Sequence, residues 1–129
     1  MRMIDRWIAE ATACDFKVAL EVKKPKSWLK SVSAFANGIG GTLFFGIDDD
    51  RNVVGLSDAQ TDAETISRLM KERITPYPSF VLAPARENGK DILVLSVSAG
   101  HATPYYYKAD GIMEAYIRIG NESVIAPSY

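Results

Sequence analysis

The sequence predicts an α+β fold in which a mixed, mostly antiparallel sheet carries helices chiefly on one face. Periodic apolar patterns follow the order helix, strand, helix, two strands, helix and three strands. The later strands follow one another as hairpins instead of alternating with helices, which disfavours a doubly wound parallel sheet. Hydrophobic residues make up 47% of the chain, which is typical of a folded domain.

The first three predicted elements are a helix, a strand and a second helix. Helical spacing relates four apolar residues near the start, Ile4, Trp7, Ile8 and Ala11. Over residues 16–23, apolar and polar residues alternate as in a half-buried strand, which Pro25 ends. Ser27 is the expected cap of the second helix, and Asn37 or Gly38 is expected to close it in the left-handed conformation. The apolar face of that helix consists of Trp28, Val32, Phe35, Ala36 and Ile39.

The middle of the chain is predicted to contain a hairpin and a third helix. An apolar strand at residues 42–47 leads through a polar turn into a short strand at residues 53–54. Residues 61–64, Thr-Asp-Ala-Glu, have the pattern of a capping box. The apolar stripe behind this box consists of Ile66, Leu69, Met70 and Ile74. Pro76 and Pro78 end the helix.

The rest of the chain is predicted to consist of strands. Residues 80–83 and 92–97 form an antiparallel pair joined through residues 87–90, and residues 115–119 form the last strand. No internal repeat, low-complexity tract or linker is found in the sequence. We therefore expect one domain over residues 1–129, either free-standing or part of a longer regulator.

Charge and composition limit the classes of function. Fifteen basic and sixteen acidic residues give a net charge of -1, so a nucleic-acid surface would have to be a local patch. Cys14 is the only cysteine and cannot form an internal disulfide, which favours a reducing cytoplasm as the compartment. No apolar run reaches the ~20 residues of a membrane helix, so no membrane partner is expected.

A cluster of lysines is the first candidate binding feature. It comprises Lys17, Lys23, Lys24, Lys26 and Lys30, opposed within the cluster only by Glu21. Lys17, Glu21 and Lys23 would share one face of the predicted strand. Such a cluster suits a nucleic-acid backbone, where each neutralised phosphate releases counterions. The alternative is a solvated face of the sheet.

Acidic residues on two predicted strands form a second candidate site. Glu21 and Lys23 lie two residues apart, and Asp48 and Asp49 end a strand that could pair with theirs. Two carboxylates and a lysine on adjacent strands could hold Mg²⁺ and orient an attacking water. The alternative is a turn acid and a surface ion pair.

Glycines and tyrosines give two further candidates. Gly38, Gly40 and Gly41 follow a helix and precede a strand, whereas phosphate loops follow a strand and open a helix, so close packing is favoured over nucleotide binding. Tyrosines and cations alternate near the C-terminus and could stack on unpaired bases and hold phosphates, or could simply be strand residues. These residues are Tyr105, Tyr106, Tyr107, Lys108, Tyr116 and Arg118.

A series of short blocks in order resembles the Schlafen AlbA-like domain, which is described as a DNA-binding domain of bacterial transcriptional regulators and also as a "divergent AAA" segment. The blocks are residues 21–23, 34–37, 40–49, 54–56, 74–76, 92–97, 104–105 and 116–120. The resemblance implies an α+β domain that binds nucleic acid, with Asn37, Gly40, Gly41 and Gly46 as its structural motif. The AAA label implies ATP, which no nucleotide motif in the chain supports.

Vertebrate Schlafen relatives use a related domain to cleave RNA, with two glutamates and an aspartate. The resemblance places Glu21 at the second glutamate and Asp48 or Asp49 at the aspartate. Phe16 stands where the first glutamate would be, with Asp15 one residue out of register. That departure weakens the nuclease interpretation, because a shift of one residue presents a strand side chain to the opposite face.

Three hypotheses follow from the sequence. The preferred one is a DNA- or RNA-binding module without a cofactor. Its proposed contacts are Lys17, Lys23, Lys24, Lys26, Lys30, Tyr105, Tyr107 and Arg118. The second is a Mg²⁺-dependent nuclease that uses Glu21, Lys23 and Asp48 or Asp49. The third is a homodimeric scaffold that pairs through exposed sheet edges.

Overall fold

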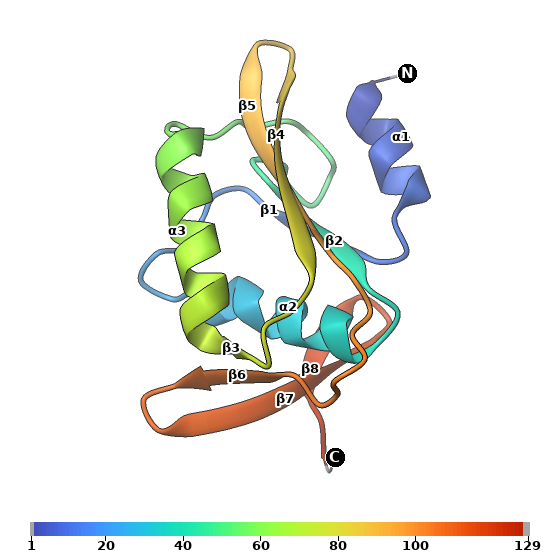
Figure 1. Cartoon of the computed structure of the whole chain (residues 1–129). Coiled ribbons are helices and arrows are strands. Elements are labelled where there is room, and N and C mark those ends of the chain that lie inside the picture. The colour runs from blue at the N-terminus through green and yellow to red at the C-terminus, as the bar shows by residue number, and fades with distance from the viewer. Residues whose placement is uncertain (1, 128–129) are drawn as a thin grey trace.

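Helices and strands are mixed along the chain in the computed structural model, which describes residues 2–127. The elements are α1 (Met3–Glu10), β1 (Cys14–Lys17), α2 (Lys26–Asn37), β2 (Gly41–Phe45), α3 (Ala59–Arg73), β3 (Ile74–Thr75), β4 (Phe80–Glu87), β5 (Lys90–Val97), β6 (Tyr106–Ala109), β7 (Ile112–Ile119) and β8 (Glu122–Ile125). The α+β class predicted from the sequence is confirmed (Figure 1).

The strands of the described residues form two sheets of four strands each. The first has the order β1-β2-β5-β4, with β1 parallel to β2 and the other pairs antiparallel. The second has the order β3-β6-β7-β8 and is antiparallel throughout. The mostly antiparallel arrangement was predicted, but the second sheet was not, because only residues 115–119 of it had a recognisable strand pattern.

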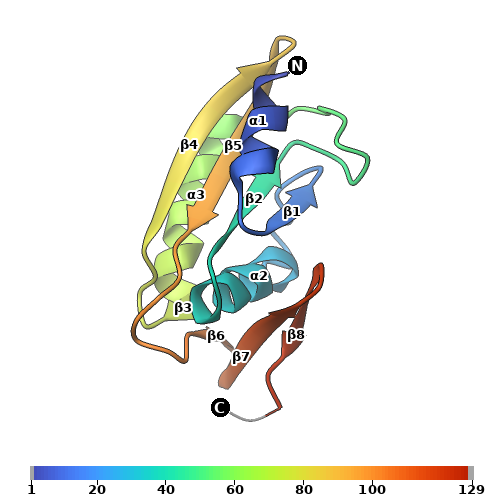
Figure 2. The same ribbon diagram turned by 90° about the vertical axis from the view of Figure 1, so that its right-hand side faces the viewer.

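Helix α2 lies between the two sheets (Figure 2). Eight of its twelve residues are buried, and they include Ser31 and Ser33 as well as six apolar residues. Trp28 meets Phe45 of β2 edge to face, with ring centroids 5.6 Å apart. Tyr107 and Tyr116 of the second sheet belong to the same core. The helix also meets the second sheet through polar contacts, because Ser33 hydrogen-bonds to the backbone of Tyr105 and Tyr116.

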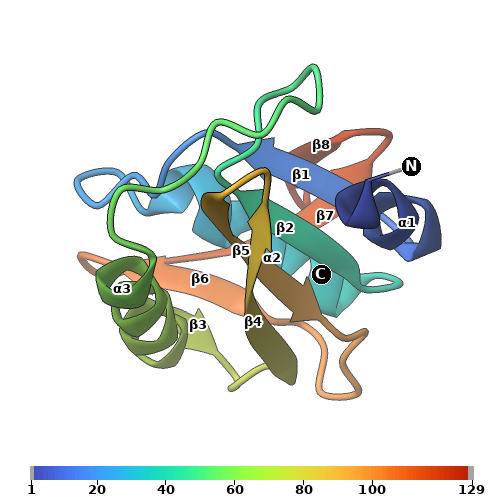
Figure 3. The same ribbon diagram turned by 90° about the horizontal axis from the view of Figure 1, so that it is seen from above.

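Helix α3 shares the α2 side of the first sheet, and α1 covers the opposite face (Figure 3). Ile66, Leu69 and Met70 join α3 to the main core. Ile4 and Ile8 of α1 form a smaller core with Phe44, Ile47 and Ile92. Two of the three helices therefore lie on one face, as predicted. No helix in residues 2–127 is both long and apolar enough to cross a bilayer.

The strand predicted at residues 16–23 is wrong beyond Lys17. Lys17 pairs with Phe45, the last residue of β2, and Gly46 then turns away with a φ of +99°. The only neighbour of this strand ends there, so residues 18–25 form a loop. Val18 and Val22 are more than half exposed, whereas Leu20 enters the main core and anchors the loop.

The expected ends of α2 are also corrected. Pro25 precedes its first turn and Ser27 lies inside the helix, so Ser27 is not the cap. Asn37 remains helical, and neither it nor Gly38 is left-handed; Gly40 takes that conformation, with a φ of +85°. Ile39 lies beyond the helix and is 74% exposed, so it does not extend the apolar face.

Other local predictions had mixed outcomes. Asp58, three residues before the predicted box, caps α3 by accepting the Thr61 backbone N–H at 3.1 Å. Ile74 is buried as expected but belongs to β3. The hairpin of residues 42–54 is confirmed only in part, because a single antiparallel β-bridge, between Ile47 and Val53, joins its two sides. The pair of β4 and β5 is confirmed and is longer than predicted.

Candidate nucleic-acid interface

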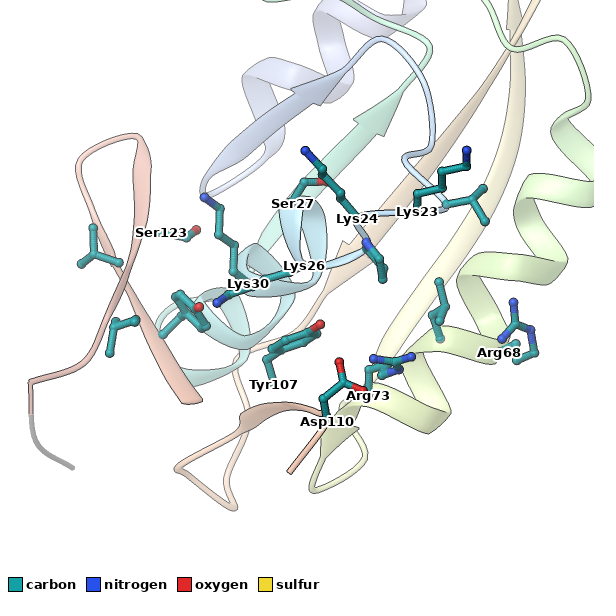
Figure 4. Close-up of a pocket in the computed structure, with 16 residues that line it drawn as sticks. Lys23, Lys24, Lys26, Ser27, Lys30, Arg68, Arg73, Tyr107, Asp110 and Ser123 are labelled. Carbon is teal, nitrogen blue, oxygen red and sulfur yellow. The ribbon is translucent and has the colours of Figure 1, made fainter. Parts of the chain in front are cut away.

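Six cationic side chains line one groove of about 950 Å³, here called the basic groove. It lies between the loop before α2, the first turns of α2, the second half of α3 and the second sheet (Figure 4). The six cations are Lys23, Lys24, Lys26, Lys30, Arg68 and Arg73. Asp110 is the only carboxylate among the residues that line the groove. Positive charge from three separate segments is therefore concentrated on a near-neutral protein.

The fold explains why these segments meet. Leu20 anchors the loop that carries Lys23 and Lys24. Lys26 and Lys30 lie four residues apart on α2, so their side chains emerge from neighbouring turns of one side. The first turn of α2 adds the partial positive charge of a helix N-terminus. α3 packs on the same face of the first sheet and brings its two arginines across the groove.

Lys26 has an internal partner. Its Nζ lies 2.9 Å from Oε1 of Glu114 on β7, and the Tyr116 hydroxyl donates to the same oxygen at 3.1 Å. Hydrogen bonds to Glu114 and Tyr116 raise the pKa of Lys26, while the ammonium lowers the pKa of Glu114. Glu114 therefore competes with any external anion for this lysine.

Most of the other groove cations lack such a partner. Arg68 pairs with Glu72 on its own helix at 3.2 Å, and both side chains are more than half exposed. In the described part of the chain, Lys23, Lys24, Lys30 and Arg73 form no salt bridge. An anionic ligand would thus find at least four cations that form no salt bridge within the described residues.

Tyrosines of the candidate set belong to the core. Tyr107 lines the groove but is only 6% exposed, and Tyr116 beside it is 3% exposed. Tyr105 is 5% exposed and lies outside the groove, where its hydroxyl accepts the Ala102 N–H at 3.2 Å. These rings present almost no face to a base.

Arg118 and Lys17 also lie away from the groove. The Arg118 guanidinium forms a salt bridge with Asp15 at 2.7 Å and lies over the Phe35 ring, 5.1 Å from its centroid. Only 12% of the Arg118 side chain is exposed, so it joins β7 to β1 and α2 instead of facing solvent. Lys17 ends β1 and is not among the residues that line the groove.

The acidic candidates are placed in exposed segments. Glu21 is exposed in the loop after β1, and Lys23 faces the groove. Asp48 accepts the Asn52 backbone N–H at 2.8 Å, which lowers its pKa, and Asp49 is exposed in the same turn. Within residues 2–127, no three His, Cys, Asp or Glu side chains are grouped so that they could hold a metal ion.

The Asn-Gly segment has a structural role. Asn37 donates to the carbonyl oxygens of Tyr105 and Tyr116, each at 2.9 Å, and accepts the Tyr105 N–H at 2.6 Å. Ser33, which the sequence analysis did not single out, donates to Tyr105 O and accepts from Tyr116 N. A Cβ on Gly41 would lie 2.6 Å from the Phe35 ring. Asn37 and Ser33 thus fix α2 against the second sheet, while Gly41 of β2 allows it to lie close to the first.

Comparison with known proteins assigns the chain to a family. The model of the family described as Schlafen, AlbA_2 matches residues 10–127. The chain belongs to the Schlafen AlbA_2 family. The match begins at the end of α1 and includes the whole basic groove, so both sheets and the groove are parts of the Schlafen AlbA_2 domain.

Two solved structures resemble this Schlafen AlbA_2 domain. One is the solution NMR structure of the N-terminal domain of a protein from Nitrosomonas europaea described as related to the ATP-dependent DNA helicase RecG. It is 27% identical, with a TM-score of 0.66 over 92% of this chain and 87% of that one. The other is the crystal structure of the DIP2311 protein from Corynebacterium diphtheriae, 22% identical, with a TM-score of 0.63. That match covers 88% of this chain but 22% of the other, and it shows the fold alone.

Proposed function

We propose that this Schlafen AlbA_2 domain binds nucleic acid by contacting backbone phosphates in the basic groove. One observation carries the proposal: six cations from a loop and two helices line a single groove that contains one carboxylate. A polyanion gains affinity at such a site because it releases condensed counterions. The net charge of -1 means that this attraction is local to the groove.

One of the two solved structures supports DNA as the ligand. The Nitrosomonas europaea domain is the N-terminal part of a protein described as related to a DNA helicase. By that analogy, the groove would supply DNA binding to the protein that carries the domain. We further propose, from the sequence resemblance, that this protein is part of a cytoplasmic transcriptional regulator. The geometry offers no comparable support for a nuclease, since Glu21 and Asp49 are exposed and Asp48 is held in its own turn.

The test is a titration of the protein into a fluorescein-labelled 20-bp DNA duplex, followed by fluorescence anisotropy at several NaCl concentrations. The double variant Lys23→Glu/Lys24→Glu removes two groove cations that have no salt-bridge partner. We expect at least a tenfold loss of affinity and a salt slope that is shallower by about 1.8, which is 0.9 for each lost phosphate contact.

A matched control separates the groove from overall charge. Arg6→Glu/Lys90→Glu changes the net charge equally, but Arg6 lies on α1, Lys90 lies at the β4–β5 hairpin, and neither lines the groove. We expect the control to bind within about threefold of the unmodified protein, because exposed charges farther away than the Debye length are screened. Equal losses in the two double variants, or no binding to the duplex at all, would overturn the proposal.

A further inference from the structure

We infer that the basic groove selects double-helical nucleic acid over single strands and does so without reading sequence. This inference rests on the proposed function and concerns the same site. It follows from two properties of the groove: cationic side chains line it, and its tyrosine rings are buried.

The groove lacks a stacking platform. Proteins that bind single strands combine cations with exposed aromatic rings on which successive bases stack. Among residues 2–127, Tyr107 and Tyr116 are the only aromatic residues lining the groove, and both are at least 94% buried. Tyr77 is more than half exposed, but it lies in the segment before β4 and not in the groove. A single strand would therefore gain little here beyond the attraction of its phosphates.

The groove also has few groups suited to reading base edges. No asparagine or glutamine lines it, although these side chains make the bidentate contacts that identify adenine. In the described part of the chain, Ser27 and Ser123 are the only serines that line it, and the Ser123 hydroxyl already accepts a hydrogen bond from Arg118 at 2.9 Å. Arginine and lysine can read guanine, but Arg68 is already paired with Glu72, which leaves Arg73 as the one unpaired arginine among the described lining residues. The four lysines carry compact charges on flexible stems, which suit phosphates in many positions.

A site that acts through charge alone favours the ligand with the higher charge density. Duplex DNA carries one charge per about 1.7 Å of its axis, twice the density of one of its strands, and each contact releases more counterion, with slopes of about 0.9 against 0.7. For four phosphate contacts, the slope of log affinity against log salt is therefore steeper for the duplex than for the single strand by about 0.8. If the two affinities are equal at 1 M salt, the duplex is favoured roughly sixfold at 100 mM NaCl and roughly elevenfold at 50 mM.

The cations are also spread across the groove. Figure 4 shows Lys24 and Lys30 on the α2 side and Arg68 and Arg73 on the α3 side, with Tyr107 between them. Contacts from two sides suit a ligand that presents phosphates over a broad surface, as a duplex does, better than one thin strand.

The experiment measures three labelled probes by anisotropy at 50, 100 and 200 mM NaCl: a 20-mer of dT, a mixed-sequence 20-bp DNA duplex, and a second duplex with the same composition in scrambled order. We expect the two duplexes to bind within about twofold of each other. We expect both duplexes to bind more tightly than the dT strand, by roughly elevenfold at 50 mM NaCl and roughly sixfold at 100 mM, and this ratio of affinities should shrink as salt rises.

Two results would overturn the inference: a dT strand that binds as tightly as the duplexes, or a tenfold difference between the two duplexes. Repeating the titrations with Lys23→Glu/Lys24→Glu separates these failures from failure of the proposed function. If that variant still loses affinity for every probe, the groove binds nucleic acid but not with this selectivity. If no probe binds the unmodified protein, the function and the selectivity both fail.

Discussion

Replacing Glu114 by glutamine should strengthen nucleic-acid binding. In the folded protein this carboxylate holds the Lys26 ammonium at 2.9 Å and acts as an internal substitute for a phosphate. Glutamine has nearly the same shape and can still accept from the Tyr116 hydroxyl, but it cannot neutralise the lysine. The substitution therefore releases one cation into the groove with little change in packing.

The size of the effect follows from the number of groove cations without a salt-bridge partner. With four phosphate contacts the salt slope is about -3.6, and a fifth contact from Lys26 makes it about -4.5. Between 50 and 200 mM NaCl, affinity for a DNA duplex should then fall about 150-fold for the unmodified protein and about 500-fold for Glu114→Gln. At 50 mM the variant should bind more tightly.

The assay is the duplex titration at four or more salt concentrations, with a thermal melt to establish that each variant is folded. Glu10→Gln is the matched control, because it removes one negative charge from α1, which covers the opposite face of the first sheet from α2. The control should leave the slope unchanged. A folded Glu114→Gln variant with the slope and affinity of the unmodified protein would refute the reasoning, since Lys26 would then not contact the ligand.

Three further predictions concern the scaffold. Asn37→Ala removes three hydrogen bonds to Tyr105 and Tyr116, so the free energy of unfolding in urea should fall by about 3 kcal/mol, whereas Asn121→Ala in an exposed turn should change it little. Gly41→Ala forces a methyl group into the Phe35 ring and should cost about 1–3 kcal/mol in the same measurement. The Thr61 N–H and hydroxyl lower the pKa of Asp58, so its contribution to stability is complete above the unfolded pKa and is lost as pH falls through the lower folded pKa. Urea midpoints measured from pH 7 to pH 3 should show this loss, and Asp58→Asn, which caps without titrating, should flatten part of it.

The sequence predicted correctly those elements whose structure depends on neighbouring residues in the chain. Asn88 and Gly89 both have positive φ, as a two-residue hairpin turn requires, and Glu87 pairs with Lys90 directly beside them. The apolar spacing likewise predicted the residues that α1 and α3 bury, although two predicted members, Ala11 and Ile74, lie beyond the helix ends. In these cases the side chains that make the pattern are also the ones that pack.

Tertiary context decided the elements that were mispredicted. Apolar and polar residues continue to alternate beyond Lys17. The strand nevertheless ends there, because its partner β2 ends at Phe45 and offers no further backbone to pair with. The strand β6 reads as a run of tyrosines, and β8 is only four residues long, so neither had a distinctive period. The same limit applied to the site: the four lysines were found because they lie close in sequence, whereas Arg68 and Arg73 join them only through the fold.

The position of α2 connects the stability of the domain to its proposed ligand site. Lys26 and Lys30 in its first turns face the groove, while Asn37 in its last turn is bound to Tyr116 of β7 and to Tyr105 just before β6. Tyr116 also touches Glu114, the partner of Lys26. A change at Asn37 can therefore move groove cations without touching them. A loss of nucleic-acid binding in a scaffold variant consequently identifies a contact residue only if α2 is still held between the sheets, whereas the surface variants Lys23→Glu and Lys24→Glu test contact directly.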